Sequence, residues 1–117
     1  MSSYSVGEVV LVDLDPTKGH EQKKTRPCMV INVHPRLALI TVFPITDSSG
    51  KSGKVFVEIK DVKSAGLHKT SVIDTYQIRT LSVDRIIQKM GSVSENEIFE
   101  CRKSLALIYE IDEDHLN

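Results

Sequence analysis

Short apolar segments, each bounded by turn-forming residues, fill the first 80 residues of this 117-residue chain. Segments rich in Val, Ile and Leu that partly alternate with polar residues are typical of β-strands, and the close turn signals leave no room for a long helix between them. About five or six short strands of this kind predict a small antiparallel barrel or sandwich. The expected strands are Glu8–Leu14, Cys28–Val33, Leu37–Phe43, Val55–Ile59 and Ser71–Ile78.

Two kinds of connection separate these segments. The tripeptide His34-Pro35-Arg36 is a tight link, which indicates that the strands on either side form an antiparallel pair. The pieces Asp47–Gly53 and Ser64–His68 are rich in turn-forming residues and predict loops.

The last quarter of the chain changes to a helical period. Ser94 and Glu97 have the spacing of a capping box, with Ser94 as the N-cap. The following apolar residues fall on one face at helical spacing, so an amphipathic helix is expected to lie on the barrel. That face consists of Ile98, Cys101, Leu105 and Ile108, flanked by Phe99 and Tyr109.

Just before this helix, Ser82 can cap a short helical turn over Val83–Lys89 that ends at Gly91. The chain is therefore expected to form a single domain over residues 1–117. Its β-barrel would cover about 5–82, its short helix about 83–89 and its C-terminal helix about 94–111.

Composition excludes several classes of protein. A hydrophobic fraction of 40% and a charged fraction of 26% are ordinary for a globular protein. No apolar run is long enough to span a bilayer and no signal peptide is evident, so we expect a cytoplasmic protein without a membrane partner. Cys28 and Cys101 lack CxxC spacing, which favours buried free thiols over a disulfide or a metal site. The four histidines lack ligand spacing, so neither a metal nor a cofactor is predicted.

The net charge of −1 hides an asymmetry. Residues 1–90 contain 13 Lys and Arg against 9 Asp and Glu, whereas residues 91–117 contain 2 against 7. A basic body favours an anionic partner, although an acidic terminal helix that only maintains solubility explains the same numbers.

The stretch GHEQKKTRP, from Gly19 to Pro27, combines cations, a carboxylate and an imidazole between two strands. Arg26 precedes a proline and is expected to be extended, so the sheet would fix the direction of its side chain. Its guanidinium fork suits phosphate oxygens, and Lys23 and Lys24 would attract a polyanion. Glu21 would either pair with Arg26 or read a base amino group. The alternative is a solvated surface loop.

Two further clusters carry polar groups at strand ends. Pro44-Ile45-Thr46-Asp47-Ser48-Ser49 offers three hydroxyls and a carboxylate, or plain turn chemistry in which Asp47 and the serines cap backbone amides. Gln77-Ile78-Arg79-Thr80 is either a second functional cluster or a strand end with a structural ion pair.

Together these motifs resemble the MazF/PemK family of toxin endoribonucleases. The resemblance runs through GEVVLVDLDPTKGHEQKKTRPCMVI, the Pro-Ile-Thr after the third strand, SVIDTYQIRTLSVDRI, Gly91 and the terminal helix. It implies a mainly β fold, an SH3-like small antiparallel barrel with a C-terminal α-helix. It also implies a homodimer that cuts single-stranded RNA at short sequences without a metal, leaving 2′,3′-cyclic phosphate and 5′-hydroxyl ends, and that a cognate antitoxin inhibits.

Carried over by position, the resemblance makes Arg26 and Thr46 the catalytic residues, with Glu21 and Gln22 beside the cleaved phosphate. Arginine is permanently charged and therefore a poor base, so Glu21 and His20 are kept as candidate general bases. With six aromatic residues and no Trp, stacking is expected to be sparse and bases to be read by loop groups. The expected RNA-binding residues are Gln22, Lys23, Lys24, Ser48, Lys54 and Gln77.

Two other functions compete with this prediction. A CcdB-like toxin of the same fold poisons a DNA topoisomerase through residues of its C-terminal helix, without an Arg–Thr pair. A non-catalytic nucleic-acid-binding barrel would use the same basic loop to bind without cutting.

Overall fold

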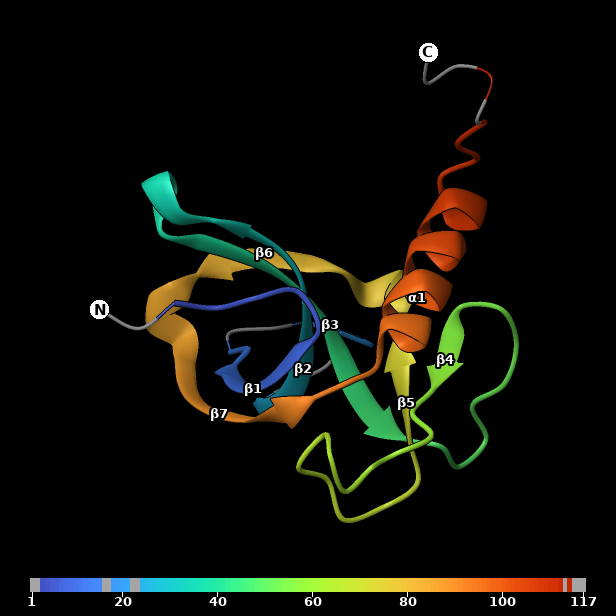
Figure 1. Ribbon diagram of the computed structural model, residues 1–117, viewed down its shortest axis with the longest axis horizontal. Coiled ribbons are helices and arrows are strands. Elements are labelled where there is room, and N and C mark those ends of the chain that lie inside the picture. Colours follow the sequence, from blue (N-terminus) through green and yellow to red (C-terminus); the bar gives the residue numbers. More distant parts are fainter. Residues whose placement is uncertain (1–2, 16–17, 22–23, 113, 115–117) are drawn as a thin grey trace.

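The structure, a computed structural model, describes residues 3–15, 18–21, 24–112 and 114 (Figure 1). In these residues the chain forms short strands, three 3₁₀ turns and one α-helix near its C-terminal end. The elements are β1 (Glu8–Asp13), β2 (Thr25–His34), η1 (Pro35–Leu37), β3 (Leu39–Asp47), β4 (Phe56–Glu58), β5 (Ser71–Asp74), η2 (Thr75–Gln77), β6 (Arg79–Ser82), η3 (Val83–Arg85), β7 (Ile86–Ser92) and α1 (Glu95–Ile108).

All strand pairs in this part of the chain are antiparallel, in the order β4-β5-β3-β2-β1-β7, with β6 pairing with β3. Register shifts interrupt the β1–β7 and β2–β3 ladders, and such bulges bend and twist a sheet. The sheet therefore curls, as Figure 1 shows for β1, β7 and β6. The expected fold, a small antiparallel β-structure with a C-terminal helix, is confirmed, although the pairings leave the barrel open between β4 and β7.

Strand β3 is the centre of the fold and takes part in two sheets. Its first half pairs with β2 and β6, as in Val42 opposite Val30 and Arg79. Its second half leaves β2 and pairs with β5, where Ile45 lies opposite Ile73. The candidate site described below lies where this exchange of partners occurs.

Both faces of the central strands are buried, which explains why the strands read as almost continuous apolar runs. Because side chains alternate between faces, neighbours in one strand enter different cores. Val9 and Met29 belong to the core beneath α1, whereas Val10 and Cys28 belong to the core on the other face. Phe43 and Val42 divide in the same way.

The strand positions agree with the sequence prediction, but the bounds do not. The second strand is longer than expected, and the third begins at Leu39 because η1 occupies the tip of the β2–β3 hairpin. The fifth expected strand, Ser71–Ile78, ends at Asp74. There η2 turns the chain towards β6, and the Asp74 side chain accepts a hydrogen bond from the Tyr76 amide.

The prediction of a short helix over Val83–Lys89 is wrong. Ser82 does cap a turn, with its hydroxyl accepting from the amide of Asp84, but that 3₁₀ turn ends at Arg85. The next residues form β7, because two β-branched isoleucines follow and the edge of β1 is free to pair with them. Gly91, expected to end a helix, lies within this strand.

Helix α1 begins as predicted, with both hydrogen bonds of the capping box between Ser94 and Glu97. Ile98 and Cys101 are buried against the sheet, and Leu105 packs at the edge of the same core. Phe99 and Tyr109 are exposed. No helix in the described ranges combines the length and apolarity needed to cross a membrane.

Both cysteines are free thiols with no exposed surface, as the sequence predicted. Burial raises the pKa of Cys28 and of Cys101 to about 12, which leaves roughly 10⁻⁴ of each thiol ionised at pH 8. We therefore expect a thiol-reactive disulfide reagent at pH 8 to label the native protein at least about 10³-fold more slowly than the protein unfolded in guanidinium. In the unfolded protein both thiols should react. Rapid native labelling of either cysteine would contradict this burial.

Candidate functional site

The candidate site opens where β2 and β3 separate. Cys28 opposite Pro44 is the last pair of their ladder. Beyond it, Arg26 pairs with Val12 of β1 and Thr46 pairs with Val72 of β5. Pro44 carries no N–H to extend the ladder, which favours separation at this point. Both side chains therefore flank the gap between the diverging strand ends.

The gap is a groove of about 410 Å³, here called the Arg26–Thr46 groove. The ends of β2 and β3 form one side and the segment before β5 forms the other. The residues that line it are Arg26, Pro27, Ile45, Thr46, Asp47, Gly66, Leu67, His68, Lys69, Ser71 and Met90.

Arg26 has a charged side chain with an unsatisfied donor. Its Nε atom is buried and has no hydrogen-bond partner. No ion pair joins Arg26 to Glu21, a pairing that the sequence left open, among the residues that the structure describes. A buried donor without a partner is uncommon and costs stability, and a bound ion or a catalytic role is among the explanations for such a group. The guanidinium is thus placed to bind an anion in the groove.

Thr46 lies opposite on β3, half-buried, and lines the groove with its neighbour Asp47. Asp47 accepts a hydrogen bond from the amide of Ser49 at 2.9 Å. Hydrogen bonds from Ser49 hold the pKa of Asp47 below its ordinary value. The carboxylate therefore performs the turn-capping role that the sequence offered as the alternative.

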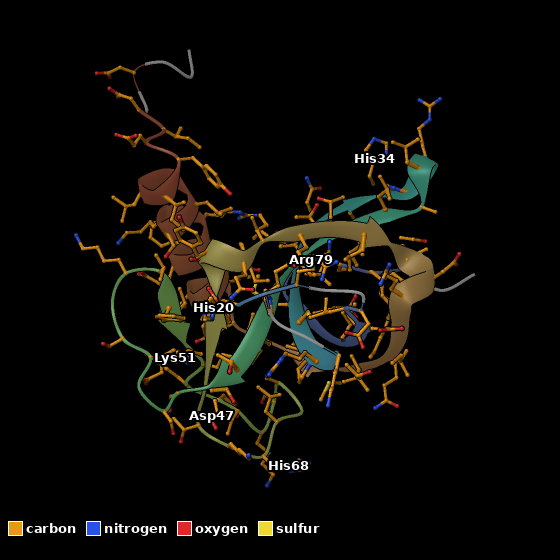
Figure 2. The ribbon with its side chains drawn as sticks, turned by 180° about the vertical axis from the view of Figure 1, so that it is seen from behind. His20, His34, Asp47, Lys51, His68 and Arg79 are labelled. Carbon is orange, nitrogen blue, oxygen red and sulfur yellow. The ribbon has the colours of Figure 1, made fainter. Side chains whose placement is uncertain are left out.

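His68 and Lys69 line the same groove and were not among the predicted site residues. They come from the loop before β5, and Figure 2 shows both His68 and Asp47 at the lower end of the molecule. Two glycines allow this loop to lie against β7. A Cβ on Gly66 would be 2.3 Å from the Met90 carbonyl oxygen, and one on Gly91 would be 2.2 Å from the Ser64 carbonyl oxygen. The only sequence signal for a role of His68 and Lys69 was that two basic residues stand together shortly before a strand.

Arginine side chains contact the main chain at the end of β1 and at the start of the segment that follows it, here called the β1–β2 loop (residues 14–24). Arg79 donates to the carbonyl of Leu14 at 2.9 Å, so its role here is a main-chain contact and not the ion pair considered from the sequence. Arg85 donates to the carbonyls of Asp13 and Asp15. These contacts link β6 and η3 to the loop that leads to Arg26.

The two candidate bases lie in a different depression from Arg26 and Thr46. His20 and Glu21 line a hollow of about 450 Å³ with residues of η2 and β6, here called the loop hollow. Its full lining is His20, Glu21, Tyr76, Gln77, Ile78 and Arg79. Gln77 donates through Nε2 to the carbonyl of His20 at 3.3 Å. Figure 2 shows His20 and Arg79 near the middle of the molecule, away from His68.

The remaining predicted RNA-binding residues are dispersed. Lys54 lines a third hollow, between β4 and α1. Ser48 follows β3, and its amide donates to the carbonyl of Thr70. Lys24 is exposed, with its amide donating to the Asp15 carboxylate at 3.0 Å. Gln22 and Lys23 lie outside the described residues.

Comparisons with known proteins agree with this fold. Residues 5–109 match the family model described as PemK-like, MazF-like toxin of type II toxin-antitoxin system. The endoribonuclease MazF of Staphylococcus epidermidis is 36% identical over 103 residues, which cover 85% of each chain.

Solved structures show the same fold. MazF from Deinococcus radiodurans superposes with a TM-score of 0.80 at 22% identity, covering 95% of this chain and 100% of the other. A mycobacterial endoribonuclease in complex with its cognate antitoxin superposes with a TM-score of 0.72 at 16% identity, covering 94% and 98% of the two chains.

Proposed function

Since the chain belongs to the PemK-like, MazF-like toxin family of type II toxin–antitoxin systems, we propose that it is an endoribonuclease that cuts single-stranded RNA in the Arg26–Thr46 groove. The observation that carries this proposal is the buried, unpartnered Nε of Arg26 in a groove that Thr46 also lines. A phosphodiester is an anion with two non-bridging oxygens, and it matches the donors of a guanidinium fork.

The chemistry uses the nucleophile that RNA itself provides. The 2′-hydroxyl attacks the adjacent phosphorus while its proton passes to a base. The bond to the 5′-oxygen breaks, and that oxygen takes up a proton. The products are a 2′,3′-cyclic phosphate and a 5′-hydroxyl. The reaction requires a 2′-hydroxyl next to the cleaved bond, so DNA would not be cut.

Arg26 and Thr46 have separate tasks in this reaction. The Arg26 guanidinium donates hydrogen bonds to the non-bridging oxygens as negative charge develops on the phosphorane. The Thr46 hydroxyl donates to the same group. Fixed donors stabilise the transition state more than they stabilise the substrate, because the charge they face increases during the reaction. Lys69, which lines the same groove, adds positive charge on its opposite side.

His20 and Glu21 of the β1–β2 loop are the candidate proton acceptors, and this role requires the RNA to contact the loop hollow as well as the Arg26–Thr46 groove. A positioned general base contributes about 10²–10⁴-fold to a rate. We expect one of His20→Gln and Glu21→Gln to lower cleavage by that factor and to displace the acid limb of the pH–rate profile. If both variants keep the wild-type rate and the acid limb, neither residue is the base.

We also propose that the active form is a homodimer and that a cognate antitoxin inhibits it. A fold of this size offers long RNA only a shallow surface, and two subunits would build a longer groove, lined by the basic loop Lys18–Arg26. An acidic segment of the antitoxin would occupy the same cationic surface, so its affinity should fall with salt. Light scattering of the purified protein tests the dimer, since a fully active species with the mass of one chain would contradict it.

Cleavage of RNA without added metal is the experiment that tests the proposed function. Purified protein is incubated with a long single-stranded RNA in EDTA, and the 5′ ends of the products are mapped. We expect cuts at a small set of recurring short sequences. Binding without cutting would identify a non-catalytic nucleic-acid-binding barrel instead, and cleavage abolished by EDTA would exclude the metal-independent reaction.

A further inference from the structure

The loop hollow contains an exposed aromatic side chain that the chemistry above does not use. Tyr76 is 67% exposed and lines this hollow with the β1–β2 loop residues His20 and Glu21. We propose that the loop hollow is a subsite for one unpaired base of the RNA substrate, with Tyr76 as the surface on which that base stacks. This inference rests on the proposed function and concerns substrate recognition, not the cleavage step.

Hydrogen bonds fix the backbone just before Tyr76 and at its own amide. Thr75 is fully buried, and both its amide and its hydroxyl donate to the carbonyl of Val55, at 3.0 and 2.7 Å. The amide of Tyr76 donates to the carboxylate of buried Asp74 at 3.1 Å. An aromatic ring on a fixed backbone has only two side-chain torsions to order, so little conformational entropy is lost when a ligand binds to it.

Other exposed aromatic side chains in the described part of the chain lie on or beside α1. They are Phe99 and Tyr109, and neither lines the loop hollow or the Arg26–Thr46 groove. Phe99 is already covered by the Lys103 ammonium, 5.7 Å from its ring centroid. Tyr76 is therefore the exposed ring that adjoins the loop leading to the groove.

The rest of the hollow is suited to the polar edge of a base. One oxygen of the Glu21 carboxylate accepts from the Lys18 amide, and the carboxylate retains lone pairs that can accept from an exocyclic amino group. Arg79 donates to the Leu14 carbonyl and brings a positive charge and further N–H donors. Sequence-specific RNA recognition uses this combination of a stacking surface with polar groups at the base edge. An aromatic surface alone would bind every base, so Glu21 and Arg79 are the groups that would select among bases.

The subsite is also close to the cleavage groove along the chain. Glu21 and Arg26 are five residues apart, and a fully extended chain of that length spans at most about 18 Å. A base stacked on Tyr76 therefore belongs to a nucleotide near the cleaved bond. The position of that nucleotide relative to the bond would be fixed, which makes the proposal testable by removing one base at a time.

The test measures binding and not cleavage. The probe is an RNA oligonucleotide that spans a mapped cleavage site and carries a single 2′-deoxy nucleotide there to prevent cutting. A series of oligonucleotides replaces each base in turn by an abasic nucleotide. Dissociation constants are measured with the wild-type protein, Tyr76→Ala, Tyr76→Phe and Tyr109→Ala, the last as a matched control for loss of an exposed tyrosine.

We expect Tyr76→Ala to weaken binding of the intact oligonucleotide by about 10-fold or more, as loss of one stacked base does, while Tyr76→Phe and Tyr109→Ala bind like wild type. One abasic position should cost the wild type at least a similar factor and cost Tyr76→Ala clearly less, because both changes remove the stacking contact. Circular dichroism would verify that the variants are folded.

The proposal would be overturned if every abasic position weakened binding to Tyr76→Ala by the same factor as binding to the wild type. It would also be overturned by unchanged RNA affinity in Tyr76→Ala with weakened binding of the antitoxin, which would assign Tyr76 to a peptide surface. In either case wild-type RNA cleavage would remain intact, so failure of the subsite is distinguishable from failure of the proposed endoribonuclease. A wild-type protein that neither binds nor cuts RNA would overturn both.

Discussion

Replacing Arg26 with alanine is expected to lower the rate of RNA cleavage by about 10³-fold or more while leaving the protein folded. The guanidinium is the charged donor of the Arg26–Thr46 groove, and its Nε has no internal partner to lose. Removing a half-buried charge without a partner ion should leave the melting temperature unchanged or raise it. Single-turnover cleavage of a defined RNA, together with thermal melting, measures both effects.

Two variants make the Arg26 result specific. Arg26→Lys keeps the positive charge but loses the planar fork, so we expect it to recover only a small part of the lost rate. Arg36→Ala removes an exposed arginine at the tip of the β2–β3 hairpin and should cut RNA at the wild-type rate. In cells, expression of the wild type should arrest growth and expression of Arg26→Ala should not. Wild-type cleavage by a folded Arg26→Ala protein would refute the proposed site.

Replacing Thr46 with alanine should reduce cleavage by about 10²–10³-fold, the loss measured when one oxyanion-hole hydrogen-bond donor is removed. The change should appear in the rate constant of the chemical step and much less in RNA affinity, since the hydroxyl acts mainly on charge that develops during the reaction. Single-turnover rates at saturating protein separate these two quantities.

Thr46→Ser keeps a hydroxyl at the same position and should retain much of the activity. Thr41 is a matched control, because it lies on the same strand but its hydroxyl pairs with that of Thr80 at 2.7 Å. Thr41→Ala should therefore cut RNA normally. A loss of less than about threefold in Thr46→Ala would leave Thr46 only its structural place in β3, where it pairs with Val72 of β5.

The sequence predicted those elements whose signals are local. The capping box located the start of α1, and the Pro35 turn located the β2–β3 hairpin. The error over Val83–Lys89 arose because a capping serine also begins a single 3₁₀ turn, while the pairing of β7 with β1 joins residues 74 to 84 positions apart. No local pattern contains that pairing.

The candidate site divides in the same way. Arg26 and Thr46 carried sequence motifs, and the exchange of partners by β3 brings them to one groove. His68 and Tyr76 carried no motif. Their places depend on a loop packed against β7 and on η2 packed beside the β1–β2 loop, which are contacts between distant segments. Sequence periodicity cannot report such contacts.

Analysis of the RNA ends tests the proposed reaction most directly. A synthetic RNA spanning one mapped cleavage site is cut in EDTA, and the same RNA with a single 2′-deoxy nucleotide at that site is treated alongside it. Attack by the 2′-hydroxyl in the Arg26–Thr46 groove predicts a 2′,3′-cyclic phosphate and a 5′-hydroxyl from the first RNA and no cut in the second. A 3′-hydroxyl with a 5′-phosphate, or cleavage of the 2′-deoxy RNA at an unchanged rate, would contradict it.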